Sequence, residues 1–338
     1  MRKYLLPKEG SFYKANLHAH ATGSDGEFTP EQMKEEFKKR GYQVLCITEH
    51  EVLKDYTCFD DEDFIFINGY ELSINDNKSK EWTENKCAHL NIYSGDKHNT
   101  KQVCYNPDAI WFAGDEVKNA IEYYGEIAHR EYSPEYINKV IKECNERGFI
   151  VCMNHPYWSL QEPDELCQYE GLYALEIYNT DNVYWGWPEY DIYAYDIMSR
   201  HGIRLGVQMA DDNHNHSSES DQLYGTFGGF NMIKANELTY EAIFEALKSQ
   251  NFYCSQGPEI LDLYIEDNFV HIKCSNVKDI IMLTGIRHVK RKFAKDGMFI
   301  TEASFPIEKR FQYIRFDVID ENGRHANTRA YFADEWGM

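Results

Sequence analysis

The sequence predicts an α/β protein in which a barrel-like domain of alternating strands and helices precedes a small all-β domain. Two observations lead to this prediction. Short apolar runs alternate with helical segments through the first three quarters of the chain, which is the pattern of repeated βα units. Beyond Gly257 and Pro258 the helical signals end and β-type alternation takes over. We therefore expect a barrel over residues 1–257 and a β-sandwich-type domain over residues 258–338.

The first βα unit has the clearest signals. Residues 14–20 alternate like a strand. Thr29 then supplies a helix N-cap, Pro30 takes the first helical position, and Gln32 completes a capping box. A glycine ends this helix, and residues 44–48 form the next expected strand.

The later elements repeat this alternation. Further strands are expected at residues 64–67, 89–93, 149–153, 174–178, 204–209 and 227–233. Helices are expected at residues 133–148, 189–201 and 239–249. Residues 95–132 are rich in tyrosine and asparagine and fit no regular element, so we expect an insertion there. In the all-β part, strands are expected at residues 261–265, 270–274 and 313–319, and a hairpin turn at residues 320–323.

Composition limits the partners that the protein can attract. Fifty-six acidic against 35 basic side chains give a formal charge of -21, which repels bulk nucleic acid and anionic membranes. A phosphorylated substrate would therefore need a local positive centre, such as a metal ion. No apolar run reaches the length of a membrane span or of a signal peptide. The nine cysteines lack a C-x-x-C spacing, so we expect reduced thiols and a cytoplasmic protein.

Histidines and carboxylates recur where predicted strands end. His18 and His20 close the first strand, and side chains two residues apart point to the same side and can bind one metal. Alone, such a pair is more often an accident of the surface or core. Asp25, His50 and Glu71 each follow a predicted strand, although Asp25 also suits an ordinary turn. The regularity favours a shared site.

The same pattern continues further along the chain. His89 opens a strand, His155 follows one, and Asp212 and His214 come directly after another. In a parallel barrel the carboxyl ends of the strands share one face, so we expect these groups to converge. Asp211 could replace Asp212, but the two-residue spacing to His214 favours Asp212. Imidazole and carboxylate together suit Zn, Mn or Fe rather than Ca or Mg.

Six short motifs carrying these residues occur in a fixed order. They are Asn16-Leu17-His18-Ala19-His20, Ser24-Asp25-Gly26, Ile47-Thr48-Glu49-His50, Gly69-Tyr70-Glu71, Asn154-His155-Pro156 and Asp212-Asn213-His214. In this order they resemble the PHP (polymerase and histidinol phosphatase) superfamily over residues 16–255. The resemblance implies a distorted (β/α)7 TIM-like barrel and a metal-dependent phosphoesterase. Glu49 departs from the pattern, because the family usually has Asp there.

Carried over residue by residue, the resemblance implies a centre of three metals. The implied ligands are His18, His20 and Asp212 for the first metal, Glu71 as a bridge to a second metal held by His89 and His155, and Asp25, His50 and His214 for the third. The expected cofactors are about two to three divalent ions, Zn, Mn or Fe, and a hydroxide formed on them would attack the phosphate ester.

Other residues are candidates for proton donation and phosphate binding. His129 and Arg130, adjacent in the insertion, are the first candidates, and a salt-bridged surface pair is the alternative interpretation. His216 is a second possible acid. Glu176 is a possible acid behind the ligands but more often a charge at a strand end. The aromatic run at residues 184–188 either stacks a base or sugar or packs against the barrel rim.

Three functions are compatible with these residues. The first is a phosphoesterase acting on a small phosphorylated metabolite or nucleotide. The second uses the same metals to hydrolyse a C–N or carboxyl ester bond. The third is a non-catalytic PHP module that binds a partner through the β-domain, and the complete ligand set argues against it. The expected partner is a small phosphorylated substrate, and the sequence leaves the oligomeric state open.

Overall fold

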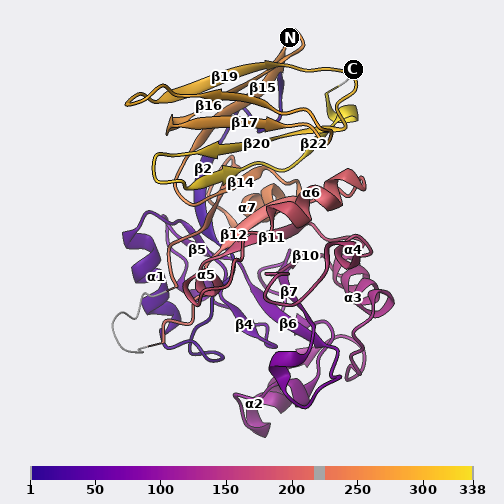
Figure 1. Cartoon of the computed structure of the whole chain (residues 1–338). Coiled ribbons are helices and arrows are strands. Elements are labelled where there is room, and N and C mark those ends of the chain that lie inside the picture. Colours follow the sequence, from indigo (N-terminus) through magenta and orange to yellow (C-terminus); the bar gives the residue numbers. More distant parts are fainter. Residues whose placement is uncertain (1, 217–224, 337–338) are drawn as a thin grey trace.

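The computed structural model describes residues 2–216 and 225–336, which form a mixed α/β structure with several sheets (Figure 1). The helices are short and lie in the first three quarters of the chain. They are α1 (Pro30–Lys39), α2 (Asp115–Ala120), α3 (Pro134–Glu146), α4 (Pro163–Leu166), α5 (Thr180–Tyr184), α6 (Ile192–Arg200) and α7 (Tyr240–Lys248).

The strands belong to two large sheets and two smaller ones. The six-stranded sheet has the order β12 (Gly206–Ala210), β11 (Ala174–Asn179), β10 (Phe149–Met153), β7 (Cys87–Ser94), β6 (Gly69–Asn75) and β4 (Thr48–His50). The ten-stranded sheet has the order β18 (Lys290–Phe293), β17 (Asp279–Leu283), β20 (Tyr313–Ile319), β21 (His325–Asn327), β14 (Phe252–Ser255), β13 (Phe230–Ala235), β2 (Ser11–Asn16), β3 (Val44–Leu45) and β5 (Ile65–Phe66), with β22 (Tyr331–Phe332) beside β20. A four-stranded sheet contains β1 (Lys3–Tyr4), β15 (Ile260–Glu266), β16 (Phe269–Val277) and β19 (Ile300–Pro306), and β8 (Lys101–Gln102) pairs with β9 (Glu122–Tyr123).

Strand directions differ from the parallel barrel that we expected. Strands β10, β11 and β12 run parallel, as do β2, β3 and β5. The expectation is wrong at β7, which is antiparallel to β6 and β10, and at β13, which is antiparallel to β2 and β14. Strand β7 returns beside β6 after residues 76–86, which contain no α-helix, and a parallel neighbour would need a longer crossover. The closed (β/α)7 barrel stays a prediction, because the described ladders leave two separate large sheets.

The C-terminal strands are joined to the rest of the chain through one sheet. Strand β21 pairs with both β14 and β20, so the ten-stranded sheet continues from the first part into the second. The four-stranded sheet covers that end, and Leu263, Ile272, Ile280 and Phe316 from the two sheets share one apolar core. Strand β1 pairs with β15, which places the N-terminal strand in the C-terminal part, and Figure 1 shows both termini at this end.

A buried ion pair attaches this end of the molecule to α6. Arg315, on β20, donates from Nε and Nη2 to the two carboxylate oxygens of Asp196, both at 2.7 Å. The Arg315 side chain is only 2% exposed. Because two parallel hydrogen bonds fix the geometry of both side chains, this pair holds β20 and α6 in a defined relation.

Several local predictions are confirmed. Thr29 and Gln32 form the capping box of α1, with the Thr29 amide donating to Gln32 Oε1 at 2.8 Å. Gly323 takes φ +74° in the turn between β20 and β21, where only glycine is unstrained. Residues 95–132 contain α2 and the β8–β9 pair, contrary to the expectation of no regular element, and their being an insertion stays a prediction. Within the described ranges, no helix is long and apolar enough to cross a membrane.

Candidate metal centre

The nine predicted ligands come together at one place in the fold. Their donor atoms fall into overlapping groups within which all atoms lie within 4.8 Å of one another. These groups are His18, His20, Glu71 and Asp212; Glu71, His89 and His155; and His20, Asp25, His50 and His214. They match the three sets that the family resemblance implies, with Glu71 shared between the first two as a bridge would be, except that His20 also joins the third set.

The first group is built where the chain leaves β2 and β12. The His20 amide donates to the Asn213 carbonyl at 3.0 Å, and the Asp212 amide donates to the His18 carbonyl at 2.9 Å. This pairing of backbones brings three side chains together. Asp212 Oδ1 lies 3.0 Å from His18 Nε2 and 2.9 Å from His20 Nε2. Asp211 points elsewhere and accepts a hydrogen bond from Thr180, so Asp212 is the carboxylate that faces the histidines.

Glu71, on β6, lies at the middle of the cluster. Its Oε1 is 3.1 Å from His89 Nδ1 and 3.3 Å from His155 Nε2, while Oε2 is 3.0 Å from His50 Nδ1. The Glu71 side chain is buried. Burial alone would raise the pKa of its carboxyl, but the charges of His89 and His18 hold that pKa well below its ordinary value. An ionised, buried carboxylate among imidazoles is suited to bridge two cations.

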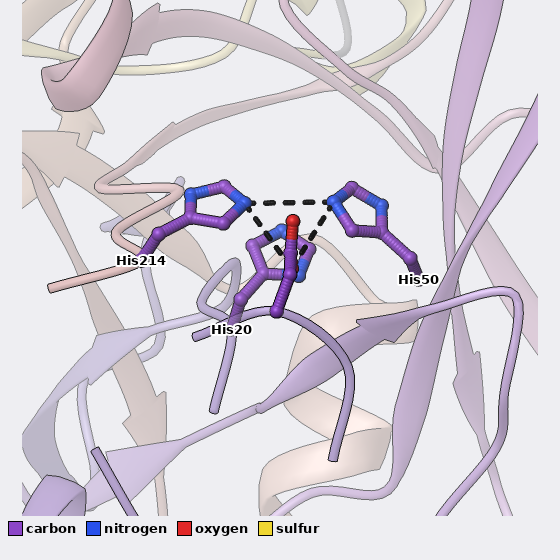
Figure 2. Close-up of side chains that lie close together, drawn as sticks. His20, His50 and His214 are labelled. Carbon is purple, nitrogen blue, oxygen red and sulfur yellow. Dashed lines mark hydrogen bonds and ion pairs between the residues drawn. The ribbon is translucent and has the colours of Figure 1, made fainter. Parts of the chain in front are cut away.

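The third group contains three histidines that lie close together, His20, His50 and His214 (Figure 2). Asp25 belongs to the same group. Asp25 Oδ1 is 3.6 Å from His50 Nε2 and 3.5 Å from His214 Nε2, and the His20 ring stacks on both histidines. Burial lowers the pKa of His20 to about 3, and His50 and His214 act in the same direction. The His20 imidazole is therefore neutral at physiological pH, which is the form that binds metal.

The donor set fits divalent cations. Among the described residues, three buried atoms of the cluster, His18 Nε2, His20 Nδ1 and Glu71 Oε2, make no hydrogen bond of acceptable geometry, although His18 Nε2 lies 3.0 Å from Asp212 Oδ1 and Glu71 Oε2 lies 3.0 Å from His50 Nδ1. A buried polar atom without a partner costs on the order of 1–3 kcal/mol, and a cation bound among these atoms would offset that cost. Asp212 and His155 also hold left-handed backbone conformations, with φ of +54° and +22°. Such strained residues cluster at functional sites.

Glu176, on β11, orients His18 from behind. Its Oε2 is 2.9 Å from His18 Nδ1, and both side chains are fully buried. Its Oε1 accepts a hydrogen bond from Asn179 Nδ2, which also donates to Asp212 Oδ2, both at 3.0 Å. The interpretation of Glu176 as a strand-end charge is therefore wrong. By fixing the proton on Nδ1, Glu176 directs His18 Nε2 at the centre.

Glu49 holds the turn that carries Asp25. It is buried and accepts hydrogen bonds from Ser24 Oγ at 2.5 Å and Tyr56 Oη at 2.6 Å. A Cβ on Gly23 would lie 2.1 Å from Glu49 Oε1, so this close approach requires glycine. Although its side chain is longer than that of Asp, Glu49 therefore still positions the turn that carries Asp25.

The predicted acids and phosphate-binding residues are not grouped with these ligands. Arg130 borders the cavity, but its terminal nitrogens donate to both carboxylate oxygens of the buried Glu51 at 2.8 and 2.6 Å. Arg130 thus forms a buried ion pair with Glu51. The salt-bridged surface pair that was the alternative interpretation is not what the structure shows, and His129 takes no part in the ion pair. His129 is exposed and does not line the cavity. His216 is half-exposed, stacks on His214 and lies 3.7 Å from Glu27.

A cavity of about 1020 Å³ opens above the centre. Its lining includes seven of the nine predicted ligands, several tryptophans and Asp181, in α5. Burial and, to a smaller extent, the nearby Asp212 carboxylate raise the pKa of Asp181 to about 8. Sequence analysis missed Asp181. The available signal was its position just beyond the strand that carries Glu176.

Comparison with solved structures finds proteins of similar type, all at low identity. A two-domain protein from Bacteroides vulgatus, containing a predicted PHP-like metal-dependent phosphoesterase, is 14% identical, with a TM-score of 0.42 over 97% of this chain and 90% of that one. A putative metal-dependent phosphoesterase from Bifidobacterium adolescentis is 18% identical, with a TM-score of 0.36 over 64% of this chain and 91% of that one. An amidohydrolase from Chromobacterium violaceum, solved with bound sulfate and no metal, is 16% identical, with a TM-score of 0.36 over 59% of this chain and 87% of that one.

No family model matches the sequence, and no curated protein does.

Proposed function

We propose that this chain is a PHP-superfamily phosphoesterase that uses a trinuclear centre of Zn, Mn or Fe to hydrolyse a phosphate ester of a small metabolite or nucleotide in the cytoplasm. One observation carries the proposal. Nine imidazole and carboxylate groups from distant parts of the chain converge in three overlapping groups, and three of their buried donor atoms lack hydrogen bonds. Such a concentration of unsatisfied donors is costly unless cations bind there.

The residues that would hold the metals follow from the grouping. His18, His20 and Asp212 would bind the first ion, His89 and His155 the second, and Asp25, His50 and His214 the third, with Glu71 shared between the first two. When bound, divalent ions supply Lewis acidity, which polarises a phosphoryl group and lowers the pKa of water from about 15.7 to about 7.

The chain's own groups orient the reactants and move protons. Glu176 fixes the ring of His18, and Glu49 fixes the turn of Asp25, so the donor atoms are positioned before substrate arrives. Asp181 carries a proton below a pH of about 8 and lines the same cavity. It is suited to protonate the oxygen of the leaving group.

A second candidate function is hydrolysis of a C–N or carboxyl ester bond by the same metals. Arg130 is the one arginine or lysine among the described residues that line the cavity, and it is paired with Glu51. Phosphate recognition usually recruits a free arginine. With none available, recognition of a phosphate would depend on the metals alone, and this observation keeps the second candidate in consideration.

The test compares phosphate release by three proteins with Mn, Zn or Fe added. We expect the wild type to release phosphate from p-nitrophenyl phosphate and the His18→Ala variant to lose that activity. The matched control is His98→Ala, because His98 is exposed and outside the ligand groups. Hydrolysis of p-nitrophenyl acetate without phosphate release would favour the second candidate, and equal activity in the His18 variant would contradict both.

A further inference from the structure

The mouth of the cavity is lined with tryptophan. The chain has six tryptophans, and five of them line this one cavity: Trp82, Trp111, Trp158, Trp185 and Trp187. Trp82 and Trp111 are 72% and 69% exposed. Large aromatic surfaces are seldom left in water, and a cluster of them around a cavity marks a binding surface. The metal centre does not account for this concentration of indole rings at its mouth.

The tryptophans continue outward from the metal centre. The Trp158 ring lies 5.1 Å from that of His155 and 5.3 Å from that of His89. The Trp82 ring lies 6.5 Å from that of Trp158 and is largely exposed. Trp111, from the 95–132 segment, lies 6.4 Å from His50. A molecule with its scissile bond at the centre would therefore extend across several indole faces.

Apart from the predicted metal ligands and the pair of Arg130 with Glu51, the polar lining of the cavity consists of five asparagines, Ser73 and the carboxylates Asp108 and Asp181. Asn75, Asn77 and Asn106 line the cavity without a neighbouring free cation, because Arg130 is paired with Glu51. Asn182 also lines the cavity but is only 6% exposed, and its Nδ2 has no hydrogen-bond partner among the described residues. A buried amide donor without a partner indicates that a ligand oxygen completes its hydrogen bonding.

Ring orientation argues against one way of binding a nucleobase, which is insertion between two parallel aromatic rings. The planes of Trp82 and Trp158, which both line the cavity, are tilted by 40°, so this pair forms no parallel clamp. A sugar ring needs only one indole face to pack against. The cavity, at about 1020 Å³, lies at the upper end of the ~300–1,000 Å³ range of small-molecule sites, so a chain of rings fits better than one.

We propose that the substrate carries its scissile group on a neutral carbohydrate of more than one sugar ring, which stacks on Trp82, Trp111 and Trp158 and hydrogen-bonds to Asn182. This inference rests on the proposed function for the location of the reacting bond only. Carbohydrate binding itself is measurable without any hydrolysis.

The experiment measures binding of neutral oligosaccharides to the metal-loaded protein by isothermal titration calorimetry. The probes are maltotriose, cellotriose, mannotriose, galactotriose and chitotriose, with uridine 5′-monophosphate as the competing class. We expect at least one trisaccharide to bind, and the Trp82→Ala and Trp111→Ala variants to weaken that binding at least about tenfold each. The control is Phe293→Ala, because Phe293 is 66% exposed on β18, outside the cavity lining, so binding and activity should be unchanged.

The outcomes separate this inference from the proposed function. If no trisaccharide binds, or if only the nucleotide binds and does so through the tryptophans, the carbohydrate inference is wrong even where p-nitrophenyl phosphate is hydrolysed. If a trisaccharide binds through Trp82 and Trp111 but no phosphate ester is hydrolysed, the carbohydrate inference stands and the phosphoesterase proposal fails.

Discussion

Replacing Glu176 with glutamine tests whether the buried residues behind the ligands control metal binding. Glutamine keeps the size of the side chain but removes the negative charge that lies 2.9 Å from His18 Nδ1. The Glu176 carboxylate now accepts from both His18 and Asn179, whereas the amide of glutamine has one accepting oxygen and can keep only one of these two hydrogen bonds. If its oxygen accepts from His18, its NH₂ group faces the donating Nδ2 of Asn179, and one hydrogen bond is lost. The imidazole also becomes a weaker ligand without its charged partner.

The expected magnitude is a 10- to 100-fold loss of affinity for the first metal, or about 1.4 to 2.7 kcal/mol. The assay titrates metal-free protein with Zn²⁺ in competition with a chromophoric chelator, and circular dichroism confirms that the variant is folded. Glu170→Gln is the matched control, because Glu170 is exposed and outside the ligand groups. A Glu176→Gln variant that binds zinc within about twofold of the wild type would refute this reasoning.

Three further predictions concern stability and the Asp25 turn. Asp196→Asn leaves Arg315 buried without its charged partner, so urea unfolding should show a loss of about 3–5 kcal/mol, and an unchanged midpoint would contradict the role given to this pair. Gly23→Ala places a methyl group against the Glu49 carboxylate, so we expect a loss of about 1–3 kcal/mol and one fewer bound metal, measured by unfolding and elemental analysis. The hydrogen bond with the Asp317 carboxylate, on β20, raises the pKa of His325. This contact therefore stabilises the fold fully below pH 6.5, and its contribution is lost as the pH rises through the raised pKa. His325→Gln should therefore lower the melting temperature at pH 5.5 more than at pH 9, and an equal loss at both would exclude the ionic contribution.

The sequence predicted the convergence of the nine groups but only part of the fold around them. Helix α1 and the turn at residues 320–323 were predictable because capping boxes and Asn-Gly turns are local, and their signals lie within a few residues. The direction of β7 was not predictable, because an apolar strand has the same composition whether its neighbour is parallel or antiparallel.

The supporting residues were the hardest to predict. Glu176 and Asp181 both follow or lie within an apolar run, and nothing local separates a buried carboxylate that orients a histidine from a solvated one. For Arg130 the error was the opposite one, because the sequence suggested a role in substrate binding for a side chain that is paired with a buried carboxylate. An arginine beside a histidine in an insertion suggests phosphate binding, yet its partner Glu51 is 79 residues away in the sequence. Partners so distant in sequence are brought together by the fold and leave no local signal.

The central claim is that the cluster around Glu71 is a centre of two to three metals. Elemental analysis of the purified protein, after incubation with Mn, Zn and Fe and removal of free metal, tests it most directly. We predict about two to three ions per chain in the wild type and at least one fewer in Glu71→Gln, because that side chain joins two of the ligand groups. A wild-type protein that retains less than about one ion per chain, or a Glu71→Gln variant with an unchanged metal content, would contradict the claim.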